Sequence, residues 1–205
     1  MPPEAPVSPT MMRRCATLKA ILEPPVDSMI MLTTPRLILR RFEAGDLGKL
    51  QALLGDPTVM WDRIQGPLRP EEVPPILARL EASYAARGYG FFAVEHVEDQ
   101  RFLGFAGILD QDIDGRIEPE IGYRLHAEEW GQGFATEAAR ACLDLGRERF
   151  GLGRLISIIR PDNTRSQRVA EKNGFTIEKR VFWPRASAEV DVWVAPRAPT
   201  SSPKA

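Results

Sequence analysis

The chain has 205 residues, of which 43% are hydrophobic, and a formal net charge of -1. That length allows one domain to bury a sizeable core without disulfides or metals. The near-neutral balance argues against a polyanionic partner, so we expect no nucleic-acid role. No stretch approaches the roughly 20 apolar residues of a membrane span, and we therefore expect no membrane association.

Cysteine and histidine are scarce: the chain has Cys15, Cys142, His96 and His126. Two cysteines far apart in sequence fit a reducing compartment better than a disulfide framework, which favours the cytoplasm. With so few thiol and imidazole ligands, a zinc site is hard to assemble, and we expect no metal.

Both ends of the chain are rich in proline. Nine of the eighteen prolines fall in residues 1–28 and 195–205, where apolar periodicity is also weakest. We therefore divide the chain into a flexible N-terminal extension at 1–31, a domain at 32–195 and a disordered C-terminal tail at 196–205.

Within the domain, apolar patterns predict strands and helices that do not follow a simple alternation. Strands are predicted at residues 36–42, 91–95, 102–109, 118–125, 155–160, 175–181 and 188–194. Helices are predicted at 44–54, 71–87 and 134–150, and a short one from an Asn163 N-cap to residue 173, closed by Gly174. Cys142 lies on the apolar stripe of the helix at 134–150, which predicts a core residue. The order of elements favours an α+β or mixed-sheet domain.

A small-residue segment at 131–136, sequence GQGFAT, lies between a strand and the long helix. The first amides of a helix have no intrahelical partner and carry partial positive charge, which makes this point a candidate anion site. Gly133 and Ala135 would let a diphosphate approach the backbone. The alternative is a plain strand-to-helix turn. The segment is not a Walker loop, and Thr136 at the sixth position breaks the GxGxxG dinucleotide pattern.

Residues 130–138, sequence WGQGFATEA, resemble the acetyl-CoA loop of the GNAT superfamily, in the subgroup that includes ribosomal-protein-alanine N-acetyltransferases. Trp130 stands where the superfamily usually has Gln or Arg, a substitution common in this subgroup. The resemblance also takes in TPRLILR at 34–40, DPTVM at 56–60, GYGFFAVE at 88–95, EIGYRL at 120–125, NTRS at 163–166 and EKNGF at 171–175.

This resemblance implies an α+β GNAT fold: a mostly antiparallel twisted sheet of about seven strands, helices on both faces, and splayed fourth and fifth strands. It implies acetyl-CoA as co-substrate. The pantetheine arm would bond to the backbone along Tyr123, Arg124 and Leu125. The pyrophosphate would lie on Gln132, Gly133, Phe134, Ala135 and Thr136. Asn163 and Ser166 would line the arm near the thioester, although both can equally be capping residues of a short helix.

The implied activity is acetyl transfer to a primary amine, on a protein N-terminus or a small molecule, by direct attack in a ternary complex. The attacking amine must be neutral, which costs about 1 kcal/mol at pH 7 for an α-amine and about 4.6 kcal/mol for a lysine. Glu120, acting directly or through water, is our candidate base, and Glu118 on the same face is the competing choice. Ser166 could help to protonate the leaving sulfur.

Other side chains have weaker support. Trp61, Trp183 and Arg185 fall in segments expected to rim the acceptor cleft, but either tryptophan could be core or lid packing. The cations Arg165, Arg168 and Lys172 recur at helical spacing and could neutralise cofactor phosphates, although such a run is more often a solvated helix face.

Two other classes of function remain open from the sequence. One is a non-catalytic acyl-CoA-binding module of the same fold, and the weaker one is a generic nucleotide-binding domain. A homodimer is common in the resembled subgroup, but no sequence feature specifies an oligomeric state.

Overall fold

The computed structural model describes residues 29–197. Within them, eight strands form one sheet in the order β1-β2-β3-β4-β5-β6-β8-β7. The strands are β1 (Ile30–Thr33), β2 (Leu37–Arg40), β3 (Phe91–His96), β4 (Phe102–Ile113), β5 (Arg116–Leu125), β6 (Ile156–Ile159), β7 (Thr176–Trp183) and β8 (Ala188–Val194). Neighbours pair antiparallel except β5 and β6, so the expected mixed, mostly antiparallel sheet is confirmed.

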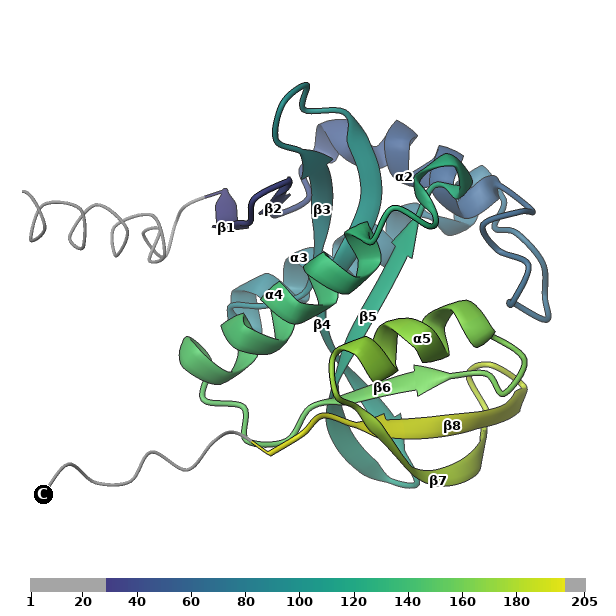
Figure 1. Cartoon of the computed structure of the whole chain (residues 1–205). Helices are drawn as coiled ribbons and strands as arrows, with labels where there is room; N and C mark the ends of the chain where they lie inside the picture. The colour runs from purple at the N-terminus through teal and green to yellow at the C-terminus, as the bar shows by residue number, and fades with distance from the viewer. Residues whose placement is uncertain (1–28, 198–205) are drawn as a thin grey trace, which may run out of the picture.

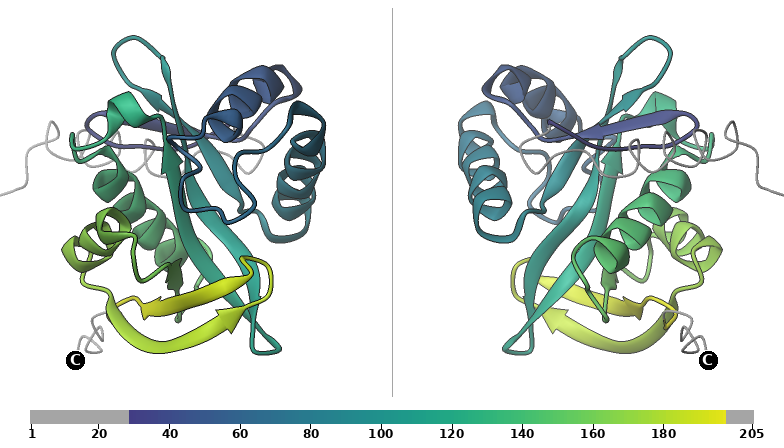
Figure 2. Two further views of the ribbon diagram at one scale, coloured as in Figure 1. Left: turned by 90° about the vertical axis from the view of Figure 1, so that its right-hand side faces the viewer. Right: turned by 90° about the vertical axis from the view of Figure 1, so that its left-hand side faces the viewer.

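The helices lie on both faces of this sheet, as predicted. They are α2 (Leu47–Gly55), α3 (Pro74–Arg87), α4 (Phe134–Glu148) and α5 (Thr164–Lys172), with short 3-10 turns η1 (Ala44–Asp46), η2 (Pro70–Glu72) and η3 (Ala127–Glu129). Figure 2 shows α2 and α3 on one face and α4 and α5 on the other. None of the helices described here is long and apolar enough to cross a membrane.

The structure contains one strand, β1, that is not among the seven strands predicted from the sequence. It pairs with β2 at one edge of the sheet, and its Met31 is only 1% exposed. The predicted domain start at residue 32 therefore falls inside a strand. A four-residue strand beside a proline-rich segment is too short to show a clear period. The rest of the predicted extension, residues 1–28, and residues 198–205 of the predicted tail lie outside the described part of the chain.

The core lies between the sheet and its helices. Helix α4 packs against β4 and β5 through side chains that include Phe134, Ala138 and Cys142. Cys142 is completely buried, which confirms it as a core residue, and burial raises the pKa of its thiol to about 12. This packing fixes the N-terminus of α4 next to the end of β5.

Strands β5 and β6 diverge, and this splay creates the space for a site. Their parallel ladder contains one pair, Glu120 with Ile156, after which the two strands separate (Figure 1). Side chains satisfy the backbone across the gap: Ser157 Oγ donates to the Ile121 carbonyl at 3.0 Å. The expected splay of these two strands is therefore present.

Candidate active site

Two cavities meet where β5 and β6 separate. We call them the Glu120 cavity, of about 290 Å³, and the glycine-loop cavity, of about 370 Å³. Five residues line both: Asp62, Tyr123, Arg124, Asn163 and Ser166. The two cavities therefore adjoin at these residues, between the start of α4 and the interior of the sheet.

The glycine-loop cavity gathers nearly all of the residues predicted to hold the cofactor. Nine of the ten line it: Tyr123, Arg124, Leu125, Gly133, Phe134, Ala135, Thr136, Asn163 and Ser166. Gln132 is the exception, because its side-chain amide donates to the Glu128 carbonyl and to Glu129 Oε2. Gln132 contributes to the loop through its main chain instead.

The loop presents main-chain amides to this cavity. The first bond of α4 runs from the Glu137 amide to the Gly133 carbonyl, so the amides of Phe134, Ala135 and Thr136 precede the intrahelical ladder. Gly131 and Gly133 have φ of 79° and 84°, in the left-handed region that favours glycine. The backbone conformation thus favours glycine at both positions. The absence of a side chain would also let a diphosphate approach the main chain.

A cluster anchored on Glu137 holds the loop against the connection between β1 and β2. Thr34 Oγ1 donates to Glu137 Oε1 at 2.6 Å, and Arg36 Nε donates to Glu137 Oε2 at 2.7 Å. Arg36 Nη1 in turn donates to the Gln132 carbonyl at 2.9 Å. Burial opposes ionisation of Glu137, but the hydrogen bonds from Thr34 and Arg36 outweigh it and lower the pKa of the carboxyl. This cluster fixes the loop in the conformation that exposes its amides.

Positive charge surrounds the same cavity. Arg165, Arg168 and Lys172 of α5 all line it, and the Arg165 guanidinium lies 4.4 Å from the centre of the Trp130 ring. Cations and free amides on one wall suit a ligand with several phosphates. Trp61, expected to rim the acceptor cleft, lines this cavity and not the Glu120 cavity.

Strand β5 offers main-chain groups to the space between β5 and β6 at alternate residues. The His126 amide donates to the Leu103 carbonyl, so the antiparallel alternation directs the main-chain groups of Arg124 toward β4. Those of Tyr123 and Leu125 face the splay, but the Leu125 carbonyl already accepts from Trp130 Nε1 at 3.0 Å. Arg124, expected to bind through its backbone, can face the cavity only through its side chain.

Asp62 ties together the elements around the junction, and the sequence analysis does not single it out. Arg124 Nη1 donates to Asp62 Oδ1 at 2.9 Å, and Asn163 Nδ2 lies 3.3 Å from Asp62 Oδ2. Asp62 belongs to the connection between α2 and α3, which thereby crosses to β5 and α5. The only feature of the sequence that could have indicated Asp62 is the length of this connection, because long connections are often binding loops.

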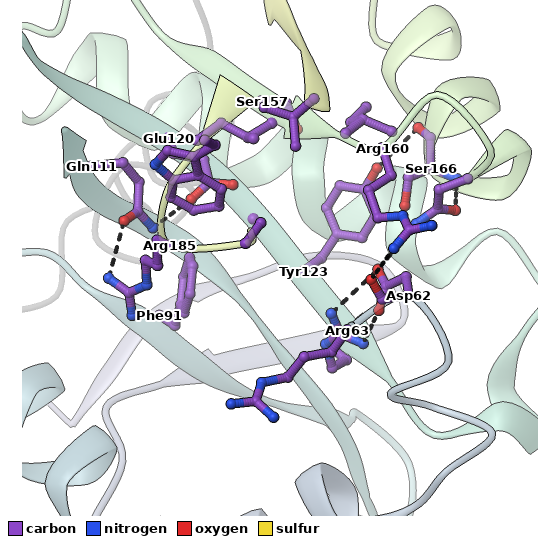
Figure 3. Close-up of a pocket in the computed structure, with 18 of the residues that line it drawn as sticks. Asp62, Arg63, Phe91, Gln111, Glu120, Tyr123, Ser157, Arg160, Ser166 and Arg185 are labelled. Atoms are coloured by element: carbon purple, nitrogen blue, oxygen red, sulfur yellow. Dashed lines mark hydrogen bonds and ion pairs between the residues drawn. The ribbon is translucent and has the colours of Figure 1, made fainter. Parts of the chain in front are cut away.

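The start of α5 confirms one expectation. Asn163 Oδ1 accepts from the Ser166 amide at 3.1 Å, which is the predicted N-cap. Tyr123 Oη donates to the Ser166 carbonyl at 3.1 Å, and burial raises the pKa of this phenol. The Tyr123 hydroxyl therefore lies beside the main chain of Ser166 at the junction, in the region drawn in Figure 3.

The Glu120 cavity contains one buried carboxylate. Gln111 Nε2 donates to Glu120 Oε2 at 2.7 Å, and the Ile158 amide also bonds this carboxylate across the splay. Burial raises the pKa of Glu120, and these bonds together with the charge of Arg185 offset only part of the effect. A carboxylate with a raised pKa is a stronger base.

Glu118 lies in a different environment from Glu120. Its carboxylate accepts from Arg154 Nε at 3.0 Å and lies 3.4 Å from Arg116 Nε. It lines neither cavity. Trp183, by contrast, lines the Glu120 cavity, and its indole donates to the Asp112 carbonyl at 3.1 Å. Of the two carboxylates weighed as a base, Glu120 is therefore the one with access to a cavity.

Within the described residues, no group of three or more His, Cys, Asp and Glu side chains is arranged to hold a metal ion. The amides and cations of the glycine-loop cavity, in contrast, fit the pyrophosphate of the cofactor that the sequence implies.

Comparison with known proteins identifies the family. The model of the acetyltransferase (GNAT) domain matches residues 36–176. The uncharacterized protein YkkB of Bacillus subtilis (strain 168) is 37% identical over 153 residues, which cover 73% of this chain and 87% of YkkB. The crystal structure of an acetyltransferase from Agrobacterium tumefaciens str. C58 aligns with a TM-score of 0.69 and 26% identity, covering 81% of this chain and 94% of that one.

The ribosomal L7/L12 alpha-N-protein acetyltransferase RimL shares the fold, with a TM-score of 0.66 and 18% identity over 80% of this chain and 92% of its own. At this level of identity the likeness shows a shared fold. The family match covers strands β2 to β6, the glycine loop and α5, and leaves Trp183 and Arg185 outside it. The chain therefore belongs to the GNAT acetyltransferase family and is an acetyltransferase enzyme.

Proposed function

We propose that this enzyme transfers the acetyl group of acetyl-CoA directly to a primary amine in a ternary complex, with Glu120 as the base. The observation that carries this proposal is that the two cavities adjoin and share five lining residues. One end has the amides and cations suited to a pyrophosphate, and the other has a buried carboxylate with a raised pKa. Donor and acceptor can thus enter from separate sides and meet at the junction.

The cofactor end would bind through the main chain. The amides of Phe134, Ala135 and Thr136 would accept the pyrophosphate charge, and Arg165 and Arg168 would complement it. The pantetheine arm would add to the free edge of β5 at Tyr123 and Leu125. The amides of Tyr123 and Leu125 are then the main-chain donors available to polarise the thioester carbonyl.

The chemical step would proceed in the Glu120 cavity. The amine nitrogen bonds to the thioester carbonyl carbon, the carbon–sulfur bond breaks, and the products are an amide and the free thiol of CoA. Glu120 takes the proton that the nitrogen loses, directly or through water, and Ser166 donates a proton to the leaving sulfur. Tyr123 is the competing donor, because its hydroxyl lies beside Ser166. A terminal amine needs less help from a base than a lysine does, because its pKa is near 7.8 rather than 10.4.

The test is release of CoA thiol from acetyl-CoA in the presence of dipeptides, free amino acids, polyamines and aminoglycosides. We expect release that depends on the amine and is first order in enzyme. Initial rates measured with both substrates varied should give intersecting double-reciprocal lines, as a ternary complex requires. Parallel lines, or an acetylated enzyme isolated without acceptor, would contradict direct transfer.

Two matched pairs of variants assign the residues. Glu120→Gln should abolish most activity, whereas Glu118→Gln, on the same strand, should retain it because that carboxylate is engaged by Arg154. The kcat values of Ser166→Ala and Tyr123→Phe should be compared with acetyl-CoA as the donor. The variant with the larger fall in kcat identifies the residue that protonates the leaving sulfur. If the protein binds CoA but releases no thiol with any amine, a binding module replaces the enzyme proposed here.

A further inference from the structure

The Glu120 cavity contains more positively than negatively charged side chains, and this excess bears on the choice of acceptor. Asp62 is paired with Arg124, and Arg160 is paired with Asp162 at 2.5 Å. Two cations that also line the cavity, Arg63 and Arg185, have no ion pair with a carboxylate of the described residues. Glu120 is the one carboxylate of the cavity left outside an ion pair.

The positive charge is concentrated around Gln111, next to the candidate base. Arg185 Nη1 lies 3.3 Å from Gln111 Oε1, and Arg79 Nη2 lies 3.4 Å from the same oxygen. The opposite end of this amide donates to Glu120. Figure 3 shows Arg185, Gln111 and Glu120 in sequence along one wall. Two guanidinium groups thus converge on the neutral Oε1 of Gln111. The other end of the same amide is bonded to the Glu120 carboxylate.

These arginines lie close together, and neither forms an ion pair with a carboxylate of the described residues. Burial together with the like charge of Arg185 lowers the pKa of Arg79, against the attraction of Glu120 and Asp110. Guanidinium groups in this arrangement favour a planar anion, because a carboxylate can accept from two N–H groups at once. Arg63 adds a further cation from the connection between α2 and α3, where it donates to the Gly66 carbonyl at 2.8 Å.

We propose that the acceptor is a small amine that also carries a carboxylate, as an amino acid or dipeptide does, with Arg185 as a specificity-determining residue. The amine would approach Glu120, and the carboxylate would bind Arg185 with the support of Arg79 and Arg63. This inference rests on the proposed function, since it assigns an acceptor to the same cavity. A polycationic amine is disfavoured, because its remaining charges would face arginines instead of carboxylates.

The size of the cavity favours a small acceptor. A volume of about 290 Å³ is at the lower end of small-molecule sites, which suits one or two residues. Apolar contact is also present: Phe91 and Phe105 line the cavity and stack with their ring centres 5.0 Å apart. An apolar side chain on the acceptor could pack against these rings.

The experiment compares pairs of acceptors that differ only in the carboxylate. The full chain is assayed for thiol release with Ala-Phe and its C-terminal amide, with spermidine, and with the amidated tripeptides Ala-Glu-Phe and Ala-Gln-Phe. Dipeptides are preferable to single amino acids because the distant carboxylate perturbs the amine pKa less. We expect kcat/KM for Ala-Phe to exceed that of its amide by about tenfold, the value of one charged hydrogen bond. The tripeptide pair tests whether an acidic side chain on a longer peptide can replace the terminal carboxylate, and we expect a smaller ratio there.

Variants assign the preference to Arg185. Arg185→Gln should reduce the acid-to-amide ratio to near one, Arg185→Lys should keep part of it, and Arg140→Gln, an exposed arginine of α4 outside both cavities, should leave it unchanged. Calorimetry with acetyl-Ala-Phe and its amide provides the same comparison without catalysis. Thiol release that is equal for acid and amide, or fastest with spermidine, would overturn this inference and leave the proposed function intact. Absence of release with every amine would instead overturn the proposed function.

Discussion

Gln111 Nε2 donates to Glu120 Oε2 at 2.7 Å, so the candidate base is held by a neutral amide rather than by a cation. An ion pair would have lowered the pKa of this carboxyl and weakened it as a base. Here burial is the largest influence, and the pKa is raised. The contrast with Glu118, engaged by Arg154 at 3.0 Å on the same strand, explains why two similar carboxylates should differ in function.

The first prediction concerns Glu120→Gln, which keeps an oxygen for Gln111 but removes the base. We expect kcat to fall by about 10²-fold or more, with acetyl-CoA binding unchanged. The ratio of the wild-type kcat to the variant kcat should be greatest at a pH above the pKa of Glu120 and below the pKa of the amine. It should disappear at lower pH, where Glu120 is protonated. A pH profile of kcat for both proteins checks this, and parallel profiles would remove Glu120 from the role of base.

The second prediction concerns stability. A carboxyl whose pKa is raised by folding contributes stability below its unfolded pKa, and that contribution is lost as the pH rises through the folded value. Glu120→Gln should therefore have the higher Tm at neutral and alkaline pH, and the difference should shrink in acid. We expect a gain of about 2–4 °C, which corresponds to roughly 1 kcal/mol in a domain of this size. Thermal unfolding from pH 4 to 9 measures it; a variant less stable than wild type at every pH would show that the carboxylate is mainly structural.

The third prediction concerns Gly133→Val. A residue with a side chain at a φ of 84° is strained, which should cost about 1–2 kcal/mol of stability. Gly115→Val is the control, because Gly115 has a φ of 76° in the turn between β4 and β5, outside both cavities. We expect both variants to lose similar stability, but only Gly133→Val to weaken acetyl-CoA binding, by at least about tenfold. Calorimetry and thermal unfolding separate the two effects; equal affinity in both variants would place the pyrophosphate elsewhere.

The fourth prediction concerns the cluster around Glu137. Glu137→Ala removes the acceptor of Thr34 and Arg36, and with it the support for the Gln132 carbonyl. We expect the Kd for acetyl-CoA to rise by about three- to tenfold, with a smaller effect on kcat. Glu178→Ala, which removes an exposed partner of Arg154, is the matched control and should bind normally.

The pKa of Glu137 gives this cluster a pH dependence. A lowered pKa means that the stability it contributes is present above the unfolded value and is lost as the pH falls through the folded one. The difference in Tm between wild type and Glu137→Ala should therefore narrow in acid. A constant difference down to pH 3 would indicate that the ion pair contributes little.

Local sequence signals predicted much of the fold. Strand β8 occupies the residues expected, and the N-cap at Asn163 follows from a side chain that bonds three residues along the chain. The splay and the mostly antiparallel pairing of the sheet came from resemblance rather than periodicity. Strand β1 was missed because four residues beside a proline-rich segment are too few to establish a period.

The site was less predictable, because its contacts join distant parts of the chain. Glu137 lies inside the recognised loop, but its partners Thr34 and Arg36 are about 100 residues away. Gln111 and Asp62 have no local signature, since each acquires its place through pairing of strands or the path of a connection. Sequence therefore located the glycine loop, whereas the environment of Glu120 required the fold.

The most direct test is a crystal structure of the enzyme with CoA. We predict pyrophosphate oxygens within hydrogen-bond distance of the main-chain amides at 133–136, and the thiol at the junction beside Ser166, facing Glu120. A complex in which the pyrophosphate lies away from these amides, or the thiol points away from the Glu120 cavity, would contradict the account.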